Sequence, residues 1–291
     1  MHLSHKHCPL IAASLVCGLS TIAYSVNYLN AHFPGNNYFP PNVDVLSLAL
    51  TLMLMLLGSY LQFGKNSLYT KTAREFIYFF LVMSVLAFAT NAIQYTPFSP
   101  VDKQIIAFEA FLGINMQTIV AWTANYPLFK TILSLAYDSL PYQMSFLPLI
   151  LIGAQKFTYI REYYCLLLLT ALLGFTFYYF LPTMGPASFV ESPYFSAFQY
   201  ATGIKFKEIH QHISPSTIEG GLIALPSFHA IWAWLTLYLV RCWRLIFILL
   251  LPVNLLLIAS CVLLGWHYPT DLLASLFILL IAHGGYSYVK K

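Results

Sequence analysis

Long apolar segments follow one another along almost the whole of this chain of 291 residues. A helix needs about 20 mostly apolar residues to cross the roughly 30 Å hydrocarbon core of a membrane. Only 8% of the residues are charged, against roughly 25% in an ordinary soluble domain. The sequence therefore predicts an all-α polytopic integral membrane protein, a helical bundle with about eight transmembrane helices. The expected spans are Pro9–Leu29, Val45–Phe63, Glu75–Ala92, Ile132–Gly153, Tyr163–Leu181, Ser227–Val240, Leu245–Gly265 and Thr270–Tyr286.

The positions of the basic residues predict how these spans are oriented. Lys and Arg number 14, and an excess of such residues marks the cytoplasmic loops of membrane proteins. Alternate loops and both chain ends hold most of them, which predicts a multi-pass protein with both termini in the cytoplasm. The loops on the non-cytoplasmic face carry the remainder, which are Lys103, Lys130, Lys205 and Lys207.

Composition argues against two other classes of protein. The formal net charge of +4 comes from basic residues scattered in ones and twos, and without a basic stripe no nucleic-acid partner is expected. The five cysteines lie in or beside apolar segments and form no Cys-x-x-Cys pair. They are expected to be small core residues and not a disulfide framework. Neither a cofactor nor a metal site is expected.

Three segments need a separate interpretation. The first apolar run is interpreted as a retained anchor, with a signal peptide cleaved near Ala23–Ser25 as the alternative. Ile105–Val120 has helical apolar spacing among polar residues, which favours an amphipathic helix in the outer interface over a span. Pro182–Leu225 is rich in Pro, Gly, Ser and aromatic residues, and long loops of this kind often cover binding sites.

Ionisable residues at the ends of two apolar segments carry the strongest functional signal. His229 follows Pro226 and Ser227, and His267 lies four residues before Asp271. Ionisable groups in such places are costly and usually functional. If Asp271 lies in the first turn of a helix, its carboxylate can fix one tautomer of His267. The other ring nitrogen then acts as nucleophile while His229 supplies an acid, which suits phosphoryl transfer through a phosphohistidine.

These motifs resemble the second and third signatures of the type 2 phosphatidic acid phosphatase superfamily, which are Pro-Ser-x-His and Ser-Arg-x5-His-x3-Asp. This chain has Pro226–His229 and Ser260–Asp271, with Cys261 in the place of the Arg. The resemblance implies a catalytic core of about six helices in residues 99–291. Residues 1–98 would then be N-terminal transmembrane anchor helices.

The resemblance also implies a role for each matched residue. His267 would attack phosphorus, Asp271 would orient it, and His229 would protonate the leaving alcohol. Most members have Gly where this chain has Phe228, and the Lys-x6-Arg-Pro first motif is missing. These departures make the chain look more like the branch of inositolphosphorylceramide synthases and sphingomyelin synthases, as do Ala136–Asp138 and Leu181–Pro186. The chain is therefore expected to be inositolphosphotransferase-like.

Other residues are expected to replace the missing phosphate-binding cations. Ser227 is expected to contact phosphate, with helix capping as the structural alternative. Lys205, Lys207 and His210 of the long loop are the further predicted substrate contacts, and a solvated loop is their alternative. A metal site at His210 and His212 would lack a convincing third ligand.

The sequence thus predicts a metal-independent enzyme that acts on a lipid phosphate ester at the outer leaflet. Water would accept the phosphoryl group in a phosphatase, and a second alcohol would accept it in a transferase. Two other classes stay open, a haem protein with His229 and His267 as axial ligands and a proton-coupled transporter that also uses Asp138 and Asp271. Absorbance of the purified protein tests the first, and phosphate release from labelled lipids tests the second.

Overall fold

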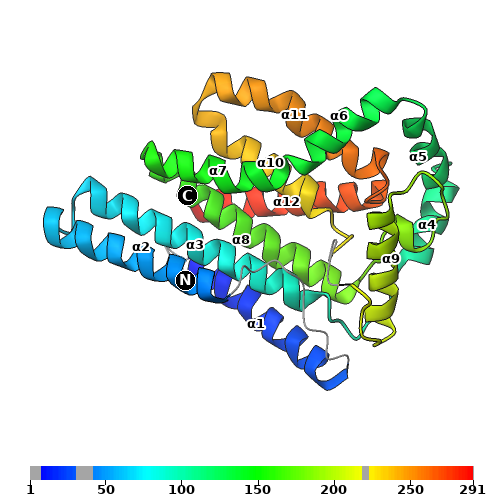
Figure 1. Cartoon of the computed structure of the whole chain (residues 1–291), viewed down its shortest axis with the longest axis horizontal. Coiled ribbons are helices and arrows are strands. Elements are labelled where there is room, and N and C mark those ends of the chain that lie inside the picture. Colours follow the sequence, from blue (N-terminus) through cyan, green and yellow to red (C-terminus); the bar gives the residue numbers. More distant parts are fainter. Residues whose placement is uncertain (1–7, 31–41, 218–222, 291) are drawn as a thin grey trace.

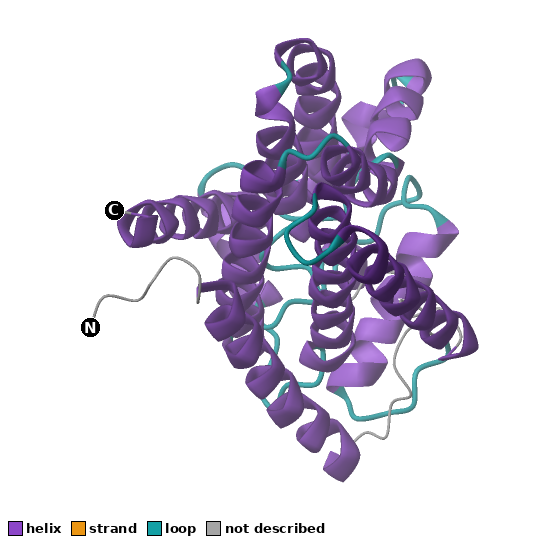
Figure 2. Cartoon of the chain, turned by 90° about the vertical axis from the view of Figure 1, so that its left-hand side faces the viewer, coloured by secondary structure: helices purple, strands orange, loops and turns teal. Residues whose placement is uncertain are grey.

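The computed structural model describes residues 8–30, 42–217 and 223–290, and in this part of the chain it contains helices and no strands (Figure 1, Figure 2). The predicted all-α membrane bundle is confirmed. Two short 3-10 helices are η1 (Pro186–Ser188) and η2 (Val240–Cys242). The α-helices are α1 (Cys8–Asn30), α2 (Asn42–Phe63), α3 (Leu68–Ile93), α4 (Asp102–Phe111), α5 (Met116–Ala124), α6 (Pro127–Asp138), α7 (Leu140–Gly153), α8 (Phe157–Phe180), α9 (Ala197–His210), α10 (Phe228–Leu239), α11 (Arg244–Leu263) and α12 (Pro269–Lys290).

Six of the described helices are long and apolar enough to cross a membrane, namely α1, α2, α3, α8, α11 and α12. The two other expected spans are shorter in the structure. Ser227–Val240 corresponds to α10, which has 12 residues, and Ile132–Gly153 is divided between α6 and α7. One continuous helix would place Pro141 in its interior, where a missing N–H and a ring clash are costly. In the first turn of α7 neither cost arises.

The expected interfacial helix Ile105–Val120 is two helices, α4 and α5, which are bent by 77°. Gly113 between them has a φ of 76°, a conformation that glycine adopts without steric cost. Asn115 then caps α5 by accepting a hydrogen bond from the N–H of Thr118 at 3.1 Å. If this bent pair counts as one span, the described residues contain seven candidate spans.

Helix α8 lies at the centre of the bundle. In its most apolar stretch of 18 residues, 67% of the residues are buried, against 33% or less in the corresponding stretches of the other long helices. It contacts α1, α3, α7, α10 and α12. Figure 1 shows α2 at the outer edge, where it packs on α3. Because α1 and α3 pack directly on α8, the predicted anchor is continuous with the core. A domain boundary near residue 98 stays a prediction.

Charged side chains gather at one end of the bundle. Oε2 of Glu162 accepts a hydrogen bond from Arg241 at 2.7 Å and lies 3.9 Å from Nζ of Lys290. Arg241 follows the end of α10, whereas His229 lies at the start of that helix. The basic residues predicted to be cytoplasmic and the first predicted motif therefore lie at opposite ends of α10.

Cysteine labelling checks the predicted orientation. In a variant whose five native cysteines are replaced by serine, a cysteine in place of the exposed Ser214 should react with an impermeant thiol reagent added outside intact cells. A cysteine in place of the exposed Arg244 should react only after permeabilisation. The opposite pattern would show that the topology is inverted.

Candidate active site

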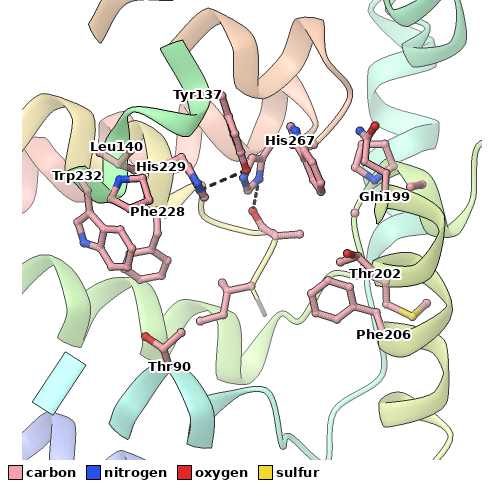
Figure 3. Close-up of a pocket in the computed structure, with 18 of the residues that line it drawn as sticks. Thr90, Tyr137, Leu140, Gln199, Thr202, Phe206, Phe228, His229, Trp232 and His267 are labelled. Atoms are coloured by element: carbon pink, nitrogen blue, oxygen red, sulfur yellow. Dashed lines mark hydrogen bonds between the residues drawn. The ribbon is translucent and has the colours of Figure 1, made fainter. Parts of the chain in front are cut away.

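A cavity of about 470 Å³ lies between α3, α6, α7, α8, α9 and α10. His229 and His267 both line it, and Figure 3 shows them together with Tyr137 on one side of the space. The ring centroids of the two histidines are 6.3 Å apart. The volume is typical of a small-molecule site. The fold thus brings both predicted catalytic histidines to one cavity.

Two acceptors hold one ring nitrogen of His267. Its Nδ1 lies 2.7 Å from the carbonyl oxygen of Ala224 and 3.2 Å from Oδ2 of Asp271. A carbonyl oxygen only accepts hydrogen bonds, so Nδ1 carries the proton and donates it. The lone pair on Nε2 is therefore available for chemistry. Asp271 lies in the first turn of α12, as expected, and its carboxylate is fully buried.

The turn before α12 requires a glycine. Gly265 has a φ of 80°, and a Cβ atom there would lie 2.4 Å from the ring of Phe195 and 2.8 Å from Val120. No other residue fits so close an approach without a shift of its neighbours. Two residues later, the N–H of His267 donates to the carbonyl oxygen of Cys261 at 2.8 Å. The backbone that leads into His267 is thereby fixed.

Two further carboxylates hold the segments around this pair. Glu109 accepts hydrogen bonds from the N–H and the hydroxyl of Thr270 at 2.9 and 2.7 Å. Asp102 accepts from the amides of Met184 and Gly185 at 2.9 and 3.0 Å. Both acidic side chains are buried, with exposures of 2% and 0%. In the sequence, Asp102 and Glu109 are acidic residues in a mostly apolar segment. The sequence does not reveal which groups donate hydrogen bonds to them.

Ser227 joins the two motifs. Its side chain caps α10 by accepting from the N–H of Ala230 at 3.4 Å, and its carbonyl oxygen accepts from the hydroxyl of Ser275 in α12 at 3.0 Å. His229 follows in the first turn of α10. The side chain of Ser227 is fully buried and has the geometry of a cap. Its contact with phosphate stays a prediction.

Tyr137 of α6 is a site residue whose role the sequence did not reveal. Its ring stacks on that of His229, with centroids 4.2 Å apart and planes at 10°. Its hydroxyl lies 3.4 Å from Nδ1 of His229. The same ring stacks on Trp266 at 5.5 Å, which precedes His267. This aromatic stack therefore links the two histidine segments.

The predicted cationic contacts do not line the cavity. Helix α9 lies in the stretch expected to be a loop. The face of α9 that lines the cavity does not include Lys205, Lys207 or His210. Lys205 is fully buried, with Nζ 5.8 Å from the ring centroid of Phe206, and Lys207 is exposed. Burial, together with the neighbouring His212, lowers the pKa of His210 to about 4, so its ring is neutral at pH 7. Phosphate contacts by Lys205, Lys207 and His210 stay predictions. The residues of α9 that line the cavity are Gln199, Thr202, Gly203 and Phe206.

Cys261 lies in the interior of the bundle. Cys261, in the place of the family's arginine, is fully buried, and its thiol donates to the carbonyl oxygen of Leu257 at 3.5 Å. It is a core residue, as expected. In the described ranges 8–30, 42–217 and 223–290, no three or more His, Cys, Asp or Glu side chains form a group that could hold a metal ion.

Comparison with known families agrees with the motifs. The sequence model of the PAP2 superfamily matches residues 103–285, a range that contains His229, His267 and Asp271 and lies inside the predicted core, residues 99–291. The predicted superfamily is confirmed, while the inositolphosphotransferase-like branch stays a prediction. Comparisons with curated proteins and with solved structures found no match.

Asp271→Asn should slow turnover of a lipid phosphate by roughly tenfold to a hundredfold. The carbonyl of Ala224 still accepts from Nδ1, so the tautomer of His267 is kept. The substitution removes the negative charge that stabilises the imidazole of His267 when that ring becomes positively charged. Phosphate release and thermal unfolding should be measured together. A normal rate, or a loss of rate that follows a loss of fold, would make Asp271 a structural residue.

Proposed function

The chain belongs to the PAP2 superfamily, and on that premise we propose that it cleaves or transfers a phosphate ester of a membrane lipid through a phosphohistidine. Superfamily membership suggests phosphatase or phosphoryl-transfer chemistry on lipid phosphates. One observation supports the finer proposal. Nδ1 of His267 lies 2.7 Å from a carbonyl oxygen, which leaves the lone pair of Nε2 free to attack phosphorus.

The proposed reaction has two steps. Nε2 of His267 bonds to phosphorus, the bond from phosphorus to the lipid oxygen breaks, and His229, which enters this step as an imidazolium, gives that oxygen a proton and becomes neutral. Water or a second alcohol then attacks phosphorus, the bond to His267 breaks, and His229 takes up the proton of the attacking group. Hydrolysis and transfer use the same residues and differ in the acceptor. No step of this scheme uses a metal ion.

Tyr137 orients His229 in this scheme. Because the two rings are parallel, the hydroxyl, which lies 3.4 Å from Nδ1 of His229, is over the face of the imidazole and not in line with the lone pair of Nδ1. The stacked rings, 4.2 Å apart, hold the orientation of the imidazole. His267 would thus be oriented by the hydrogen bonds of its Nδ1 to Ala224 and Asp271, and His229 by stacking on Tyr137.

The cavity wall suits a phosphate of low charge. Burying a dianion costs more than burying a monoanion, so a phosphodiester fits this site better than a phosphate monoester. The amides in the first turn of α10 offer further donors to it. Ser227, Lys205, Lys207 and His210 stay as proposed additional contacts. Apart from the two histidines, the polar side chains of the wall are neutral, namely Thr90, Tyr137, Ser145, Gln199 and Thr202.

We place this reaction at the outer leaflet, with both termini in the cytoplasm. His229 opens α10, and Arg241 follows its other end. The predicted cytoplasmic residues Arg241 and Lys290 meet at Glu162. An excess of basic residues is typical of the cytoplasmic face, so the cavity would face the opposite leaflet.

His267→Ala should abolish both covalent phosphorylation and turnover, because no other group at that position can attack phosphorus. Purified protein is incubated with labelled phospholipid monoesters and diesters, with and without alcohol acceptors. His283→Ala is the matched control, since His283 lies far along α12 and should keep the wild-type rate. An acid-labile phosphohistidine that maps elsewhere would refute the assignment. Lipid binding without any turnover would favour the transporter alternative.

His229→Ala should distinguish good from poor leaving groups. Natural lipid alcohols need a proton to depart, so their turnover should fall by roughly a hundredfold or more. An ester of p-nitrophenol departs without protonation and should be far less affected. The ratio of the two rates is the measurement. Equal losses for both substrates would make His229 a phosphate-binding or structural residue.

A further inference from the structure

The cavity continues beyond the histidines to α3, a helix that lies outside the matched residues 103–285. The α3 side chains that line it are spaced three, four and seven residues apart, so they share one face of the helix. This face follows the cavity for about 10 Å, because a helix rises about 1.5 Å per residue. The four residues are Met83, Leu86, Ala87 and Thr90.

The hydroxyl of Thr90 does not make this face polar. It donates to the carbonyl oxygen of Leu86, one turn earlier, at 2.7 Å. Figure 3 shows Thr90 across the cavity from His267 and Tyr137. The α3 face therefore presents apolar groups to the part of the cavity that lies away from the proposed nucleophile.

Phe228 completes the apolar wall next to His229. Its ring packs at 4.7 Å from that of Phe175 and at 5.2 Å from that of Trp232, and all three side chains line the cavity. A Cβ atom on Gly174 of α8 would lie 2.7 Å from Cζ of Phe228. Glycine at that position gives the ring the room it needs. Phe228, the bulky residue before His229, is thus a packed part of the apolar wall.

The apolar wall of the cavity consists of the α3 face, Phe228 and Trp232. On α9, Gln199 and Thr202 also line the cavity, but they already donate to the carbonyl oxygens of Leu264 and Phe198. A sugar or amino head group against the apolar wall would lose hydrogen bonds to water without replacement. A hydrocarbon chain loses none and gains from burial.

We propose that α3 and Phe228 bind a hydrocarbon chain of the lipid substrate, and that the α3 face sets which chain lengths are accepted. This inference rests on the proposed function, because the lipid phosphate would lie between His229 and His267. It assigns to α3, a helix outside the matched family core, a part in substrate selection.

Ala87→Phe tests the selection. The added ring fills the apolar end of the cavity, so kcat/KM for dipalmitoyl phosphatidylinositol should fall by roughly tenfold more than for the dihexanoyl lipid. The matched control is Leu81→Phe, which adds the same ring on the opposite, outward face of α3, where Leu81 is 51% exposed. The control should leave the ratio of the two substrates unchanged. Equal losses for long and short chains in Ala87→Phe would overturn the proposal.

Photocrosslinking locates the chain independently of turnover. The probe is phosphatidylinositol with a diazirine at the end of one acyl chain, bound to the His267→Ala variant, which cannot consume it. The label should map to Met83, Ala87 or Phe228. A label confined to outward residues such as Leu81 would refute the chain site. If the wild type turns over no lipid while the label maps to α3, the proposed reaction fails and the chain site stands.

Discussion

The hydrogen bonds at Nδ1 of His267 tie the start of α12 to Ala224, which lies 43 residues before His267 in the chain. They join the turn after α11 to Ala224, before α10, and to Asp271 in α12. Ser275 of α12 adds a bond to the carbonyl of Ser227. Because these groups are buried, leaving one unpaired would cost about 1–3 kcal/mol. The segment at Ala224 is therefore held against the turn before α12, and this arrangement fixes the proposed tautomer. Stability and chemistry depend on the same bonds.

Buried carboxylates extend this network to α4. Asp102 holds the amides of Met184 and Gly185, and Glu109 holds the first turn of α12 at Thr270. A buried carboxylate is costly unless hydrogen bonds satisfy it. The acidic residues of this short helix thus have a structural purpose that a purely apolar helix could not serve. Helix α4 ends at Phe111, just after Glu109, and the bend between α4 and α5 follows.

Sequence reasoning succeeded where the signal is local and carried by side chains. Apolar length predicted eight spans, and six of them are long apolar helices among the described residues. Motif spacing placed His267 and Asp271 side by side. The role of Tyr137 depends on the contact of its ring with His229 of α10, and Ala224 contributes a backbone oxygen, so the sequence did not reveal either role. The charge of Lys205 suggested a phosphate contact, but charge does not tell which face of a helix it occupies. The stretch predicted to be a loop contains α9, and the face of this helix that lines the cavity does not include Lys205.

The cavity takes its chemistry and its apolar wall from different parts of the chain. His229 and His267 lie in the matched core, whereas Ala87 lies in α3, before it. Phe228 belongs to the matched core and is adjacent to His229, yet its ring packs with the apolar wall. A substitution on α3 can change the shape of the cavity without touching the hydrogen bonds of either imidazole. If both proposals hold, the phosphoryl chemistry depends on the buried network around His267, whereas lipid selection depends on side chains of α3 that lie outside that network.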